Sequence, residues 1–277
     1  MSSNKFLTES PYTSTNLFPT ILKALKATGK DINNLTIKDL VPVDAFHIRG
    51  IEATKELASL IEIKPDYKIL DIGCGIGGSA RFLASKYKCF VTGVDVTEEY
   101  CKAAIELSKL LNLEDKTDFS HADAIDLPFE NESFNIVWSE HVQMNVENKQ
   151  KFYQEIYRVL KSGGKLLFYD VFKGRGDEIF YPVPWANDSS TDFLTEQNET
   201  KYLIGSLDFK INYWEDKTEL SKNWFSAMVA KVKNREPSPL GLHLVMGKNA
   251  NEKFQNMVRN LNEGNITVAQ AVVEKKF

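Results

Sequence analysis

Short apolar runs alternate along the chain with longer segments in which apolar residues recur every three or four positions. Apart from the shorter strand expected at 117–123, these runs are rich in Val, Ile and Phe and are bounded by polar residues or glycine, as is typical of buried parallel strands. They are YKILDIG (67–73), CFVTGVD (89–95), TDFSHAD (117–123), FNIVWSE (134–140) and KLLFYDV (165–171). The pattern therefore predicts several strands of one sheet.

The segments between these runs have the spacing of amphipathic helices that cover a sheet. They are GSARFLASKY (78–87), TEEYCKAAIELSKLLNL (97–113) and NKQKFYQEIYRVLK (148–161). Because strands and helices alternate, we predict a doubly wound α/β fold.

The alternation changes after the last of these strands. Residues 172–200, with GRG and YPVPWANDSS, predict a long loop or lid. Two more helices are expected at TELSKNWFSAMVAKVKN and NEKFQNMVRNLNEG, and ITVAQAVVEKK (266–276) alternates like a terminal strand. We expect a single domain over 1–277, with an N-terminal helical cap at 1–57 and lid and substrate-side insertions at 172–200 and 217–264.

Composition limits the classes of partner. A net charge of -4 gives no overall positive field for a polyanion, so a nucleic-acid partner is disfavoured. The start MSSNKFLTESPYT lacks the pattern of a signal peptide, and no long apolar run predicts membrane insertion. Cys74, Cys89 and Cys101 fit no metal-binding or disulfide spacing. We expect a cytoplasmic protein without a metal site, and an oligomer is possible.

The stretch LDIGCGIGGSA (70–80) contains Gly-x-Gly-x-x-Gly in Gly73, Gly75 and Gly78. This spacing alone is a weak indication, but ligands of open parallel sheets bind beyond the carboxyl ends of the strands. Asp95 ends the second strand, where its carboxylate could accept hydrogen bonds from a ribose diol. A nicotinamide dehydrogenase and an S-adenosylmethionine (SAM) methyltransferase both predict these features.

Asp71 separates the two alternatives. A carboxylate before the glycine turn would repel a dinucleotide pyrophosphate, whereas SAM offers an ammonium and a sulfonium that it can attract. Asp123, followed by Ala124, could accept from an adenine amino group. The alternative roles are a carboxylate that caps the turn for Asp71 and a solvated turn residue for Asp123.

Four segments between Leu70 and Asp170 resemble, in order, the motifs of the class I SAM-dependent methyltransferases. They are LDIGCGIGG, VTGVDVTEEY, ADAIDLPFENESFNIVWSEHV and YRVLKSGGKLLFYD. The resemblance is greatest to the small-molecule branch, which includes quinone-biosynthesis C-methyltransferases and sarcosine and dimethylglycine N-methyltransferases. It implies a Rossmann-like, doubly wound, seven-stranded and mostly parallel sheet, whose antiparallel last strand is inserted beside the strand around FKINYWED.

The resemblance also implies roles for individual residues. The methionine end of SAM would be lined by Asp71, Gly73 and Gly75. The ribose would contact Asp95 and Val96, the adenine would contact Asp123 and Ala124, and Glu140 would begin the substrate side.

The acceptor side is less clear from the sequence. His141 and Glu140, at the end of the central strand, are the candidate catalytic residues. His141 could take a proton near neutral pH, or else cap a helix, and Glu140 is an alternative proton acceptor. In VDAFHIRGIEAT (43–54), His47 or Arg49 could reach the SAM carboxylate, although Arg49 could equally be an exposed helix-start residue. Phe180, Tyr181 and Trp185 could form an aromatic wall or simply belong to the core.

We therefore predict an enzyme that transfers a methyl group from SAM to a small molecule by direct displacement and leaves S-adenosylhomocysteine. Catalysis would come mainly from alignment of the acceptor and exclusion of water. One alternative is a SAM-binding regulator without catalysis. Another, disfavoured by Asp71, is a nicotinamide-dependent dehydrogenase.

Overall fold

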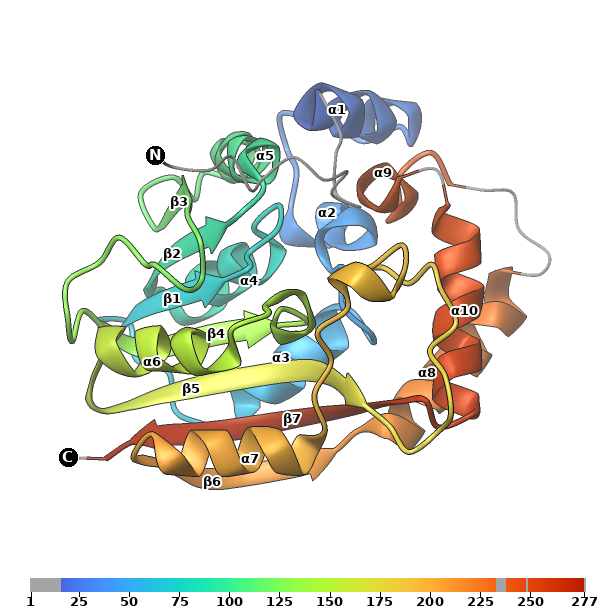
Figure 1. Ribbon diagram of the computed structural model, residues 1–277. Coiled ribbons are helices and arrows are strands. Elements are labelled where there is room, and N and C mark those ends of the chain that lie inside the picture. The colour runs from blue at the N-terminus through green and yellow to red at the C-terminus, as the bar shows by residue number, and fades with distance from the viewer. Residues whose placement is uncertain (1–15, 233–237, 248, 277) are drawn as a thin grey trace, which may run out of the picture.

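The structure is a computed structural model that describes residues 16–232, 238–247 and 249–276. Its centre is a seven-stranded sheet in the order β3-β2-β1-β4-β5-β7-β6 (Figure 1). The strands are β1 (Lys68–Ile72), β2 (Phe90–Asp95), β3 (Thr117–His121), β4 (Phe134–Glu140), β5 (Leu160–Lys173), β6 (Phe209–Asp216) and β7 (Ile266–Lys275).

The direction of the strands confirms the predicted topology. Strands β1 to β5 pair in parallel, whereas β7 lies between β5 and β6 and runs antiparallel to both. The last strand is thus inserted beside residues 209–216, as predicted. The carboxyl ends of β1, β2 and β4 consequently lie at one edge of the sheet, where a ligand site is expected.

Helices cover both faces of the sheet (Figure 1). Neighbouring strand residues face opposite layers, so Ile69 and Leu70 of β1 belong to different buried clusters. The Ile69 cluster includes residues of α3 (Ile51–Ser59), α4 (Gly78–Tyr87), α5 (Glu98–Leu110), α8 (Thr218–Val232) and α10 (Ala250–Asn262). The Leu70 cluster includes residues of α6 (Lys149–Val159) and α7 (Gln197–Ser206).

A third buried cluster joins the N-terminal helices to the edge where β1 ends. It contains residues of α1 (Leu17–Ala27), α2 (Ile37–Asp44), α5 and the short α9 (His243–Met246), which lie together above the sheet in Figure 1. The wholly buried Arg81 of α4 donates to the Asp44 carboxylate over 2.6 Å. Gly78 permits this approach, because an added Cβ would lie 2.5 Å from the Asp44 carbonyl oxygen.

Some predicted boundaries differ from the structure. Strand β5 continues to Lys173, and α7 begins at Gln197, so the segment between them is shorter than the predicted lid. It contains a 3₁₀ turn at Ser189–Thr191. Residues 1–15 of the predicted cap and residues 233–234 of the helix predicted after β6 lie outside the described residues. None of the described helices has the length and apolar composition that crossing a bilayer requires.

Candidate functional site

A cavity of about 570 Å³ lies at the carboxyl ends of β1, β2 and β4. Its volume is within the range of about 300–1,000 Å³ that is usual for small-molecule sites. Its wall is also formed by the glycine turn, the segment after β3, the end of α2 and the residues before α7. Ten of the predicted site residues line it: His47, Asp71, Gly73, Gly75, Asp95, Val96, Asp123, Ala124, Glu140 and His141.

The glycine turn has three positions that only glycine tolerates easily, with φ of 67° at Gly73, 53° at Gly75 and 84° at Gly77. An added Cβ at Gly73 would collide with a methyl group of Val142, so this glycine allows close packing under the cavity. At Gly75 an added Cβ would meet nothing within 4 Å, so it would occupy open space in the cavity. The backbone at Gly75 can therefore approach a ligand closely.

Asp71 is a buried carboxylate with unused hydrogen-bonding capacity. It is 2% exposed, and its Oδ2 atom has no hydrogen-bond partner among the described residues. Burial raises the pKa of Asp71 well above its usual value, and the negative charges of Glu140 and Asp95 raise it further. A cationic ligand group beside Asp71 would offset both effects.

Asp95 is held by the turns around it. One carboxylate oxygen accepts from the Gly75 N–H at 2.9 Å and the other from the Thr97 N–H at 2.8 Å. Burial raises the pKa of Asp95, while these hydrogen bonds oppose the rise. Since each oxygen has a second lone pair, the carboxylate can still accept from a ligand hydroxyl.

The next part of the wall follows β3. Asp123 comes two residues after the strand ends at His121, slightly later than predicted, and its carboxylate accepts from the Ile125 N–H at 3.1 Å. Val96, Ala124 and Ile125 add apolar surface to the same cavity. A flat ring with polar edges would find both kinds of contact there.

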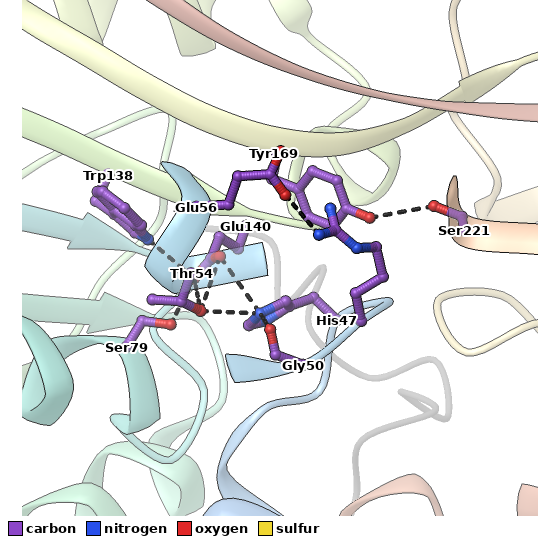
Figure 2. A network of polar contacts seen from close by, with 10 residues as sticks. His47, Gly50, Thr54, Glu56, Ser79, Trp138, Glu140, Tyr169 and Ser221 are labelled. Carbon is purple, nitrogen blue, oxygen red and sulfur yellow. Dashed lines mark hydrogen bonds and ion pairs between the residues drawn. The ribbon is translucent and has the colours of Figure 1, made fainter. Parts of the chain in front are cut away.

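Glu140 is the centre of a polar network at the end of β4 (Figure 2). Its carboxylate accepts from Thr54 Oγ1 at 3.0 Å, Ser79 Oγ at 2.5 Å and Trp138 Nε1 at 2.9 Å. His47 Nε2 lies 3.3 Å from the same carboxylate. These partners come from three separate segments, so Glu140 ties the N-terminal segment and α4 to the central strand.

The same network orients His47. Its Nε2 lies 2.9 Å from the Gly50 carbonyl oxygen, which can only accept a hydrogen bond. The proton of a neutral His47 ring therefore belongs on Nε2, and the Nδ1 lone pair is left as an acceptor.

His141 is the second imidazole of the cavity. Its ring stacks on Tyr169 with centroids 5.2 Å apart, and its Nε2 is buried without a hydrogen-bond partner among the described residues. Burial, together with the neighbouring His47, lowers the pKa of His141 well below 6.5. The environment therefore favours the neutral ring, and the role of His141 as a proton acceptor stays a prediction.

The structure does not place Arg49 in the cavity wall. Arg49 has φ of 67°, and its guanidinium donates to Glu56 over 2.5 Å. Glu56 also pairs with the buried Lys217 at 2.5 Å. Arg49 thus belongs to a partly buried ion pair outside the cavity wall, an outcome that the sequence could not indicate.

The lid contributes different residues from those predicted. Only Trp185 of the three proposed aromatic residues lines the cavity, and its Nε1 donates to Asp192 at 3.0 Å. Phe180 instead packs under the guanidinium of Arg259, with 3.3 Å between the guanidinium carbon and the ring centroid. Phe193 also lines the cavity, but no motif distinguished it in the sequence.

Residues 70–168 match the methyltransferase domain family. This segment belongs to that family. Over 123 residues the chain is 38% identical to the chloroplastic tocopherol O-methyltransferase of Arabidopsis thaliana, a match that covers 43% of this chain and 35% of the relative. The matched part thus spans about a third of that relative's length.

Solved structures share the fold over a longer part of the chain. Phosphoethanolamine N-methyltransferase 2 of Haemonchus contortus, in complex with SAM, has a TM-score of 0.72 at 20% identity, covering 87% of this chain and 58% of that one. Geranyl diphosphate C-methyltransferase of Streptomyces coelicolor A3(2), in complex with Mg²⁺, geranyl diphosphate and S-adenosylhomocysteine, has a TM-score of 0.65 at 15% identity, covering 81% and 79%. The fold is therefore the Rossmann-like methyltransferase fold.

Proposed function

We propose that this protein is a SAM-dependent methyltransferase that acts on a small molecule. The observation that carries the proposal is the buried, unpartnered carboxylate oxygen of Asp71 at a cavity that Gly75, Asp95 and Asp123 also line. Asp71 matches the ammonium of SAM, and Gly75 leaves room for its methionine end. Asp95 matches the ribose diol, and Asp123 matches the adenine. Membership of residues 70–168 in the methyltransferase domain family supports the assignment.

The residues would divide the binding of SAM among them. Asp71 would pair with the ammonium, and Gly75 would let the backbone approach the methionine end. Asp95 would accept from the ribose hydroxyls, while Asp123 and Ala124 would contact the adenine. When bound, SAM supplies a methyl group on a positively charged sulfur, so the chain needs no nucleophile of its own.

On the acceptor side we assign the proton-accepting role to His141. Its Nε2 has no partner among the described residues, and a neutral ring can take a proton from an acceptor hydroxyl or amine. Glu140 would act through its network by holding His47 and the end of β4 in place. Trp185 and Phe193 would cover the reacting groups and exclude water, which favours an aligned displacement.

Calorimetric titration with SAM and with NAD tests the cofactor, and release of S-adenosylhomocysteine in the presence of amines, quinols and phenols tests the reaction. We expect SAM binding and acceptor-dependent release. Tight NAD binding without SAM binding would support the dehydrogenase alternative. SAM binding with no release for any acceptor would favour the non-catalytic regulator. The cytoplasmic location and a possible oligomer stay predictions.

A further inference from the structure

The charged side chains that line the cavity are nearly all acidic. Apart from the two imidazoles they are Asp44, Asp71, Asp95, Asp123, Glu140 and Glu147. Among the described residues that form this wall there is no lysine or arginine. Asp44 is paired with Arg81, so the negative potential that a ligand meets comes from the other carboxylates, and the low dielectric of the surrounding protein strengthens it.

The basic side chains near the wall are occupied by other protein groups. Arg81 is wholly buried against Asp44, and Arg49 pairs with Glu56. The Lys149 amine donates to the carbonyl oxygens of Val146 and Phe193, the latter over 2.6 Å. Burial lowers the pKa of Lys149 to about 8, which reflects how little solvent surrounds it. None of these three cations is among the described residues that line the cavity.

We propose that the methyl acceptor of this enzyme carries no phosphate group and is neutral or positively charged at the methylated end. This inference rests on the proposed function and deepens it. A phosphate would add one or two negative charges to a wall whose charged side chains, apart from the two imidazoles, are all carboxylates among the described residues, whereas an amine or an uncharged hydroxyl compound would not be repelled.

A bridging metal ion is the route by which a phosphate could still enter this cavity. Mg²⁺ can join carboxylates to a phosphate, and the geranyl diphosphate complex described above contains both Mg²⁺ and a diphosphate. In the part of this chain that the structure describes, however, no group of three or more His, Cys, Asp or Glu side chains is placed to hold a metal ion. Mg²⁺ that enters with a phosphate needs only one or two protein carboxylates, so the test of the inference is run both with and without Mg²⁺.

The test uses inorganic pyrophosphate as a probe, because its binding does not depend on knowing the acceptor. The full chain is first loaded with S-adenosylhomocysteine and then titrated calorimetrically with pyrophosphate, with and without Mg²⁺. The matched variants are Thr191→Lys, which adds a cation to the wall, and Ser190→Lys, which adds the same charge to the neighbouring exposed residue outside the wall.

We expect pyrophosphate to bind Thr191→Lys at least about tenfold more tightly than it binds the native chain or Ser190→Lys. Native binding as tight as that of Thr191→Lys would overturn the inference. The inference would also be overturned if Thr191→Lys bound pyrophosphate no more tightly than the native chain, because charge would then not be what excludes the phosphate. Loading with S-adenosylhomocysteine is a separate measurement, and its failure would contradict the proposed function itself.

Discussion

Replacing Asp71 by Asn removes a charge from the cavity and keeps the volume of the side chain. In the native chain the carboxylate would form a charge-assisted hydrogen bond with the SAM ammonium, and such bonds contribute about 1.5–3 kcal/mol. We therefore expect the dissociation constant of SAM to rise by about 12- to 150-fold in Asp71→Asn. The fold should persist, because no described residue depends on Oδ2.

The raised pKa of Asp71 adds a second, more specific expectation. Burial and the charges of Glu140 and Asp95 favour the protonated carboxyl in the free protein, so pairing with an ammonium requires loss of that proton. SAM affinity should then rise with pH, by up to about tenfold per pH unit, until the raised pKa of Asp71 is passed. Asp71→Asn should lose this dependence.

Calorimetry in buffers of different ionisation enthalpy measures both the SAM affinity and the number of protons released on binding. The buffer takes up each released proton, so the observed heat differs from buffer to buffer. Asp115→Asn, which alters an exposed residue outside the cavity, is the matched control and should behave like the native chain. If Asp71→Asn binds SAM as tightly as the native chain does and releases the same number of protons, Asp71 does not contact the cofactor and the argument is refuted.

Three further changes separate the remaining roles. Asp95→Ala should weaken binding of both SAM and adenosine in calorimetry, because the ribose diol is common to them; an unchanged affinity for both would contradict the ribose assignment. Gly73→Ala and Gly75→Ala should both lower the melting temperature because both positions have positive φ, and Gly73→Ala should lower it further because its methyl group strikes Val142; equal melting temperatures would contradict this distinction. Gly75→Ala should in addition bind SAM poorly, since its methyl group would enter the cavity. His141→Ala should reduce turnover by about 10²–10⁴-fold with SAM affinity retained. Because the pKa of His141 is lowered, native turnover should fall through protonation of His141 only at pH values below the usual histidine range. A rise of turnover centred at neutral pH that His141→Ala abolishes would contradict this expectation.

The sheet could be predicted from the sequence because its information is local. Each strand is a short apolar run, and the alternation with helices restricts the topology to a few possibilities. The end of β4 at Glu140 and the start of α4 at Gly78 agree with the predicted runs to the residue. The residues of the glycine turn and of the ends of β1 and β2 could be found for the same reason, since parallel strands bring their carboxyl ends to one edge.

Features that depend on distant contacts could not be predicted. Glu140 and Thr54 are 86 positions apart, and only the folded chain shows that their hydrogen bond ties the N-terminal segment to β4. The position of Arg49 follows from a left-handed turn that its residue type does not favour. Burial likewise moves the pKa of His141 in a direction that a sequence cannot supply, because the ring's surroundings come from His47 and Tyr169.

Because several carboxyl groups are buried together, this cavity should favour a positively charged ligand. That preference would assist both the binding of SAM and the release of S-adenosylhomocysteine in the proposed reaction. A carboxyl whose pKa is raised on folding destabilises the free protein as pH rises above its unfolded value, and Asp71 and Asp95 both have such raised pKa values. A cation in the cavity relieves this cost, whereas a phosphate would increase it. When the methyl group leaves, the sulfur of the cofactor loses its positive charge, so the attraction of these carboxylates for the product falls. The electrostatics that favour SAM therefore also favour release of S-adenosylhomocysteine, provided that the acceptor brings no negative charge of its own.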